Sequence, residues 1–110
     1  MYVPVKYNSS TTLYTILLIR GRADAYVNPP IVAGDVQISK DGGNFANLTN
    51  LPTISPAGGS QVQIVLTATE ASCKIGMIRF KDQTSPPDWE EQTIVFYTYG
   101  TASGYDTRDF

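Results

Sequence analysis

The sequence predicts an all-β protein, an antiparallel β-sandwich of about seven short strands. Apolar and polar residues alternate with a period of two in several short stretches, which is typical of strands with one buried face. Seven prolines and nine glycines separate these stretches, as a protein of short strands joined by turns requires. A chain of 110 residues is long enough for one domain with its own core.

Residues 1–12 are predicted to form an extended N-terminal arm. Pro4 stands between Val3 and Val5, and a proline cannot donate to a sheet ladder except from an edge. Residues 8–12 are polar and typical of a loop. This arm could pair at an edge of the domain or reach to a neighbouring chain. The sandwich would then span residues 13–100, followed by a polar C-terminal tail over residues 101–110.

Residues 13–20 form the most apolar run, and their length is that of a strand. Both faces of this strand would be apolar, so we expect it to be central, or to have one face covered by another subunit. Pro29 and Pro30 then exclude a continuous element over residues 21–34.

Residues 35–48 predict a hairpin. Val36 and Ile38 alternate with polar residues, and Asp41-Gly42-Gly43 supplies the conformational freedom that a tight turn needs. Phe45 and Leu48 then resume an apolar side. The turn could be compared with a calcium loop, but it lacks the closing glutamate.

The second half of the chain predicts three further strands. Residues 61–68 show the cleanest alternation, with Val62, Ile64 and Leu66 on one side. Residues 67–74 predict one helical turn capped by a threonine. Strands follow at residues 74–81 and 92–99, separated by a loop that contains Pro86 and Pro87.

The residues that most enzymes use are scarce. The chain has no histidine and one cysteine, Cys73, which leaves no internal disulfide and no zinc site of Cys and His ligands. We expect Cys73 to be a small buried residue. Asp88, Glu90 and Glu91 flank Trp89, but a glycosidase needs two carboxylates held about 5–10 Å apart. Glu90 and Glu91 are adjacent and would point to opposite sides of a strand, so we expect these carboxylates to be solvated. We therefore expect that the protein is not an enzyme and uses no cofactor.

Charge and hydropathy restrict the partners. The formal net charge is −2 and the basic residues are scattered, which argues against nucleic acid because phosphate binding needs clustered Lys and Arg. The N-terminus has no signal-peptide pattern, and no apolar run approaches the roughly 20 residues that span a bilayer. We therefore expect no membrane partner and synthesis in a cytoplasm.

Aromatic and apolar residues near the termini and on the last strand are the candidate binding residues. Exposed rings can anchor a protein interface, stack on sugar faces, or simply belong to the core. Trp89, Tyr97 and Tyr99 are the candidates for a sugar platform. The full set of interface candidates is Tyr2, Val3, Val5, Tyr7, Trp89, Tyr97, Tyr99, Tyr105 and Phe110.

Four stretches resemble small immunoglobulin-like β-sandwich domains of tailed-bacteriophage virion proteins. They are the hairpin at residues 36–49, the strand at residues 64–70, and residues 78–82 and 89–95. The resemblance covers roughly residues 13–100, which is most of the chain. Such domains occur in head-decoration, neck, tail, baseplate and fibre proteins.

The resemblance implies an immunoglobulin-like fold and a non-enzymatic structural subunit of a virion, made in the host cytoplasm. Its partners would be major capsid, neck or tail proteins and further copies of itself in a homo-oligomer or multi-copy assembly. The alternative is a carbohydrate-binding adsorption module that recognises a surface glycan.

Overall fold

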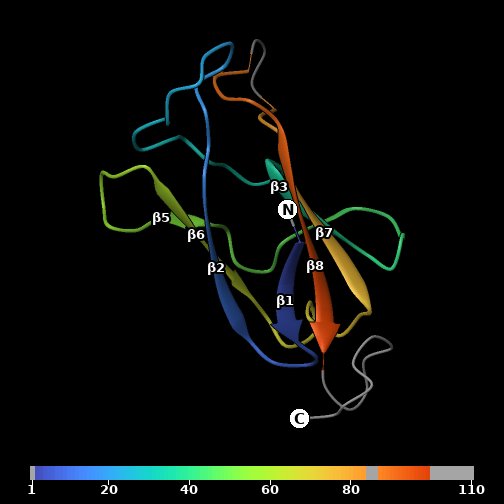
Figure 1. Cartoon of the computed structure of the whole chain (residues 1–110). Coiled ribbons are helices and arrows are strands. Elements are labelled where there is room, and N and C mark those ends of the chain that lie inside the picture. The colour runs from blue at the N-terminus through green and yellow to red at the C-terminus, as the bar shows by residue number, and fades with distance from the viewer. Residues whose placement is uncertain (1, 84–86, 100–110) are drawn as a thin grey trace.

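The structure, a computed structural model, describes residues 2–83 and 87–99. The described chain forms eight strands and no helix (Figure 1), and so contains no helix long and apolar enough to cross a membrane. The strands are β1 (Tyr2–Lys6), β2 (Thr11–Ile16), β3 (Val36–Lys40), β4 (Ala46–Asn47), β5 (Thr53–Ile54), β6 (Gln61–Leu66), β7 (Ile75–Phe80) and β8 (Gln92–Tyr99). The prediction of an all-β sandwich is confirmed.

The strands form two sheets. One has five strands in the order β1-β8-β7-β3-β4, and the other has three in the order β2-β6-β5. Neighbouring strands are antiparallel except β1 and β8, which are parallel. The expectation of a wholly antiparallel sandwich is therefore wrong for this one pair.

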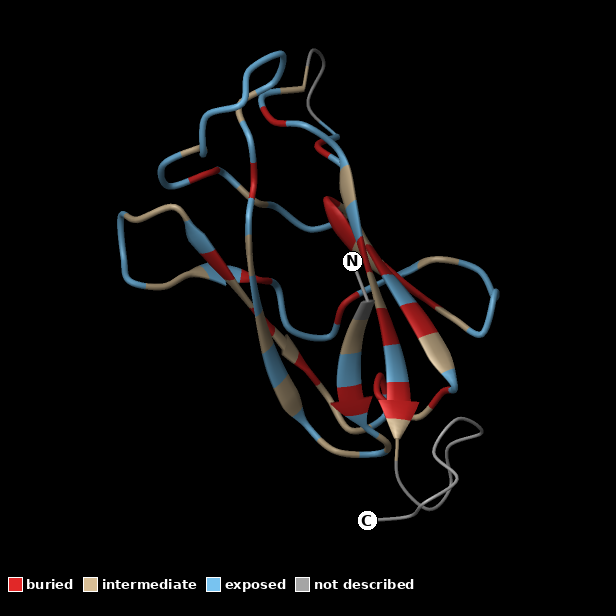
Figure 2. Ribbon diagram, in the orientation of Figure 1, coloured by how far each residue is buried: buried red, intermediate tan, exposed pale blue. Residues whose placement is uncertain are grey.

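The core lies between the sheets, and alternation along the strands fills it. Figure 2 shows buried residues alternating with more exposed ones along the strands of both sheets. Val36, Ile38, Val62, Ile64 and Leu66 share buried faces, as their alternation predicted. Strands β7 and β8 add four further core residues: Ile78, Phe80, Ile94 and Phe96. Removing such side chains from water is the main force that holds two sheets together.

The N-terminal residues belong to the sandwich. Tyr2–Lys6 pairs in parallel with Val95–Tyr99, and the side chain of Val5 is only 1% exposed. Of the two alternatives for the arm, pairing at an edge of its own domain is the one observed. Because Thr11 and Thr12 already belong to β2, residues 1–12 are not a separate unit.

The strand predicted at residues 13–20 is not central. Strand β2 begins earlier, at Thr11, ends at Ile16, and lies at the edge of the three-stranded sheet. Beyond it, Ile19 forms a bridge with Trp89, next to the start of β8 in the other sheet. The backbone N–H of Glu90 also donates to the carbonyl of Leu18 (2.9 Å). Residues 18–20 therefore pair with a segment that leads into the opposite sheet.

The predicted hairpin is present, with a short second strand. Asp41 and Gly42 both have positive φ, 51° and 79°, and the Gly43 N–H donates to the Lys40 carbonyl (2.9 Å). Two successive positive φ angles define a type I′ turn, for which Asp-Gly is a preferred pair. The Arg79 guanidinium lies 4.1 Å from the centre of the Phe45 ring, so this ring packs outside the core.

The helical turn predicted after β6 is a single capped turn. The Ala71 N–H donates to the Thr67 carbonyl (3.1 Å), which is one helical hydrogen bond. The Glu70 N–H donates to the Thr67 hydroxyl (3.2 Å), and the Thr67 N–H donates to the Glu70 carboxylate (2.8 Å). This reciprocal pair is the capping box, in which Thr and Glu stand three positions apart.

Gly76 of β7 is required by its neighbour Phe96 on β8. The two residues are paired in the ladder, and an added Cβ at Gly76 would overlap ring atoms of Phe96. Only a residue without a side chain lets the ring lie flat against β7. The packing of the buried aromatic ring of β8 thus depends on a glycine in the adjacent strand.

We expect Gly76→Ala to lower the free energy of unfolding by about 1–3 kcal/mol, because the methyl group must displace the Phe96 ring. Urea unfolding of the purified protein measures this loss. A double variant, Gly76→Ala with Phe96→Leu, should lose less than the sum of the two single variants. Strict additivity would contradict the steric explanation.

Candidate interaction surfaces

Buried carboxylates in this protein bind backbone amides. Asp35 accepts hydrogen bonds from the N–H groups of Val32 (3.0 Å) and Gln83 (3.1 Å). Glu70 accepts from Thr67 (2.8 Å) and from Thr49 (2.9 Å). Each carboxylate joins two segments that are separated in the sequence, so both have a structural role.

Two further acidic residues act in the same way. Asp41 is exposed at the hairpin turn, yet one carboxylate oxygen accepts from the N–H groups of Lys74 and Ile75, both at 3.0 Å. Buried Asp82 accepts from the Asp88 N–H (2.7 Å). Within the described residues, no group of three or more His, Cys, Asp or Glu side chains is arranged to hold a metal ion.

Two of the acidic residues around Trp89, Glu90 and Glu91, border a hollow of about 330 Å³. Asp88, Glu90 and Glu91 are exposed, as predicted. One Glu90 carboxylate oxygen accepts from the Gly21 N–H (2.5 Å) and so holds the turn that follows residues 18–20. The residues lining the hollow are Arg20, Gly21, Asp82, Pro87, Trp89, Glu90 and Glu91. The carboxylates of Asp82 and Glu90 at this hollow thus accept hydrogen bonds from backbone N–H groups. Nothing in this geometry favours a glycosidase.

Trp89 is a core residue. Its side chain is 1% exposed, and the indole N–H donates to the Pro30 carbonyl (3.4 Å). A ring that stacks on a sugar must present one face to solvent, which Trp89 does not. The prediction of Trp89 as an interface or sugar-binding residue is therefore wrong, because this side chain is buried in the core.

Two other candidates near the N-terminus, Val3 and Val5, also turn inward. Val5 belongs to the core and Val3 packs against it, which corrects their assignment to an interface. Tyr7 is half-buried, and its N–H donates to the Tyr99 carbonyl (2.8 Å). The backbone of Tyr2 belongs to β1. Two further candidates, Tyr105 and Phe110, lie outside the described residues.

Tyr97 and Tyr99 lie on the outer face of the five-stranded sheet, as their spacing predicted. Tyr97 is 36% exposed, and Tyr99 is half-buried. Met77 of the adjacent strand is 42% exposed on the same face. A shallow hollow of about 230 Å³ lies beside it, lined by Ser39, Gly42, Ile75, Gly76, Met77 and Val95.

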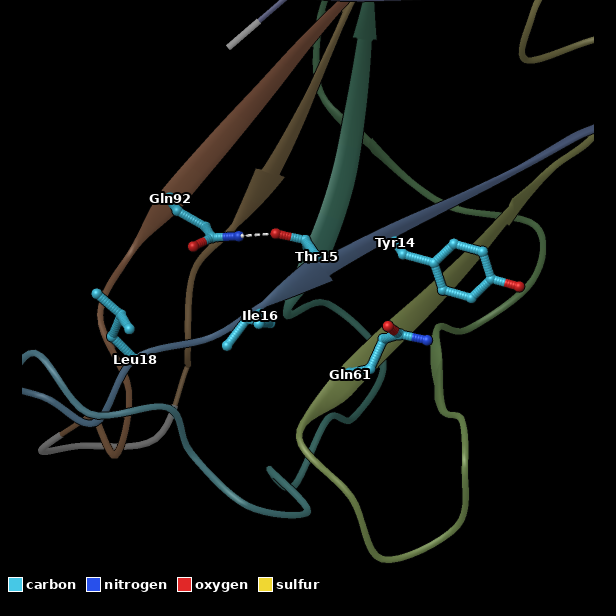
Figure 3. Close-up of a pocket in the computed structure, with 6 residues that line it drawn as sticks. All are labelled: Tyr14, Thr15, Ile16, Leu18, Gln61 and Gln92. Carbon is cyan, nitrogen blue, oxygen red and sulfur yellow. Dashed lines mark hydrogen bonds between the residues drawn. The ribbon is translucent and has the colours of Figure 1, made fainter.

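A second apolar surface lies along β2 and its continuation. Tyr14 is 53%, Ile16 48% and Leu18 37% exposed. These side chains line a shallow groove of about 480 Å³ together with Thr15, Gln61 and Gln92 (Figure 3). The Gln92 side-chain amide donates to the Thr15 hydroxyl (2.7 Å) and links β8 to β2 across the sheets. We name this the β2 surface.

Sequence reasoning did not name the β2 surface. The available signal was the run at residues 13–20, which is apolar on both faces and carries no charge before Arg20. A central strand and an exposed edge strand share this pattern, and only strand pairing separates them. The capping glutamate Glu70 was also missed, although Thr67 stands three residues before it.

Cys73 is buried, as predicted. Burial, assisted by the negative charge of Asp41, raises the pKa of the Cys73 thiol from 9.0 to about 11. The thiolate is the reactive form of cysteine, so this thiol is a poor nucleophile at neutral pH.

We expect Glu70→Gln to lower the free energy of unfolding by about 1–3 kcal/mol, because the new NH2 group cannot accept the bond that a carboxylate oxygen accepts. Glu91→Gln, at an exposed residue, is the matched control and should change it by less than about 0.5 kcal/mol. Chemical denaturation of both variants measures the difference. Equal stabilities would show that the two amide bonds to Glu70 contribute nothing.

We expect iodoacetamide to alkylate Cys73 at pH 8 at least about 100-fold more slowly in the folded protein than in urea, since the two-unit rise in pKa removes most of the thiolate. The folded protein holds the thiol proton more tightly, so stability should also fall as the pH rises above about 9. Mass spectrometry follows the alkylation, with Cys73→Ala as the unreactive control. Similar rates in both states would contradict the burial of this thiol.

The chain matches no protein-family model, no curated protein and no solved structure.

Proposed function

We propose that this protein is a non-enzymatic structural subunit of a bacteriophage virion that binds neighbouring capsid, neck or tail proteins. The main support is the exposure of apolar side chains outside both sheets. Tyr14, Ile16 and Leu18 are exposed along the three-stranded sheet, and Met77 and Tyr97 on the five-stranded one. Contiguous exposed apolar side chains mark surfaces that bind other proteins, and Tyr and Met are enriched at interfaces.

The use of the carboxylates supports a structural role as well. Asp35, Asp41, Glu70 and Asp82 accept backbone hydrogen bonds. General acid–base catalysis needs a titratable group that is free to reach a substrate proton. In the described chain, acidic side chains hold loops, and apolar side chains occupy the outer surfaces.

We also propose that the sandwich is immunoglobulin-like, and its strand order supports this. Strands β2, β6 and β5 take the positions of strands B, E and D of that fold. Strands β8, β7, β3 and β4 take the positions of G, F, C and C′, as in variable-type domains. The resemblance of residues 36–49 to phage virion domains leads to the same arrangement.

The proposed mechanism is adhesion by a rigid domain. Because β1 is part of the five-stranded sheet, the N-terminal residues no longer serve as a docking arm in this mechanism. The outer faces remain, together with residues 100–110, which carry Tyr105 and Phe110. The carbohydrate-binding alternative keeps Tyr97 and Tyr99 but loses Trp89 to the core, and no observation favours it as a second proposal.

We expect particles of a phage that lacks this gene to take up the tagged full-length chain supplied in trans. The chain should then be recovered with purified virions, and electron microscopy with a label on the tag should show it at repeated positions. A chain that stays in the soluble fraction while complete particles form would refute the virion proposal.

A variant without residues 100–110 tests the docking segment separately. Because the described strands end at Tyr99, this variant should unfold at the same urea concentration as the full chain but should be missing from particles. Incorporation of the truncated chain would show that the outer faces alone provide the attachment.

A further inference from the structure

Four strands lie at the edges of the two sheets, and three of them are protected against pairing with another chain. Strands β4 and β5 have two residues each, and β1 carries Pro4 and Lys6. Short edges, prolines and lysines are the usual means by which proteins prevent edge-to-edge association.

Strand β2 is unprotected. It has six residues, Thr-Thr-Leu-Tyr-Thr-Ile, with no proline and no charge. Among the described strands, β2 pairs only with β6. In the view of Figure 1, β2 passes in front of β6. One side of β2 is therefore open, and its threonine, tyrosine and isoleucine residues favour strand pairing.

The exposed apolar side chains of this sheet are concentrated at the open edge. On the outer face, Tyr14 and Ile16 of β2 stand opposite Gln63 and Gln61 of β6. At these two pairs the apolar residue lies at the margin of the sheet and the glutamine lies toward its middle, while at the third outer pair Thr12 stands opposite Val65. This is the reverse of the usual interface, which has an apolar centre and a polar rim.

We propose that β2 is the pairing edge for a second copy of this chain, which joins its own β2 antiparallel about a two-fold axis. The two three-stranded sheets would become one sheet of six strands. The apolar margins of the two copies then meet in the middle of the new face, and the glutamines of both copies form its rim. The proposal rests on the proposed function, in which many copies of the chain assemble, and it names β2 as the surface through which two copies contact each other.

The chemistry of the edge selects a second copy as the occupant. A two-fold axis perpendicular to the sheet places each residue opposite one of the same face, so an uncharged strand meets an equally uncharged strand. A register with Tyr14 opposite Tyr14 of the second copy pairs Thr12 with Ile16 and Leu13 with Thr15. All of these positions lie within β2, and aromatic and β-branched cross-strand pairs stabilise sheets.

The test is the oligomeric state of the purified full-length chain. We expect sedimentation equilibrium to show a concentration-dependent dimer. Tyr14→Lys should abolish it, because two ammonium groups would face each other across the two-fold axis. Val27→Lys is the matched control, since Val27 is also an exposed apolar residue but lies outside β2, and it should dimerise like the natural chain. Circular dichroism checks that both variants are folded.

Cross-linking tests the register. Directly opposed strand residues have Cβ atoms about 4.5–5.5 Å apart, so Tyr14→Cys should form an intermolecular disulfide under mild oxidation. Val27→Cys should not, and buried Cys73 should stay reduced in both.

A monomeric natural chain at all concentrations would overturn the proposal, and so would a Tyr14→Lys variant that dimerises normally. Pairing with an extended segment of a different protein would appear as a monomeric chain whose β2 amides become protected from hydrogen exchange only when particle proteins are added. The particle experiment is independent: incorporation without dimerisation would leave the virion role intact and reject the β2 pairing.

Discussion

Hydrogen bonds from backbone amides to carboxylates hold the loops of this sandwich, and the short strands depend on them. Strands of two to eight residues leave long connections whose N–H groups need acceptors. Glu70 joins the turn after β6 to Thr49, and Asp35 joins the loop before β3 to the segment after β7. Hydrogen bonds to an ionised acceptor are stronger than neutral ones, so one side chain can fix two segments.

Apolar side chains are also exposed on the outer faces of both sheets. The chain places Tyr14, Ile16 and Leu18 along one sheet edge and Met77 and Tyr97 on the other sheet's outer face. A domain with structural carboxylates and apolar outer surfaces is suited to contact with other proteins more than to chemistry on a small substrate. The proposals of a virion subunit and of a pairing edge both follow from this division.

Local sequence patterns predicted well where the strands lie along the chain, but they predicted poorly which strands pair with each other. Alternation identified the apolar faces of β3 and β6, and the Asp41-Gly42 turn followed from backbone sterics, because these features depend on residues close in sequence. The edge position of β2 and the parallel pairing of β1 depend on which distant strand lies beside each one, which no local pattern records. Trp89 was misplaced for the same reason, since the residue with which its backbone pairs, Ile19, is far away in the chain.

The parallel pair of β1 and β8 links the first described strand of this chain to the last. During synthesis the residues of β1 leave the ribosome well before those of β8. Val5 cannot pair with Thr98 and become buried until β8 has been synthesised. Contacts between residues so distant in the sequence carry the largest entropic cost of loop closure. The five-stranded sheet is therefore complete only once β8 is available, so a chain that stops before Gln92 lacks the outer face that carries Tyr97.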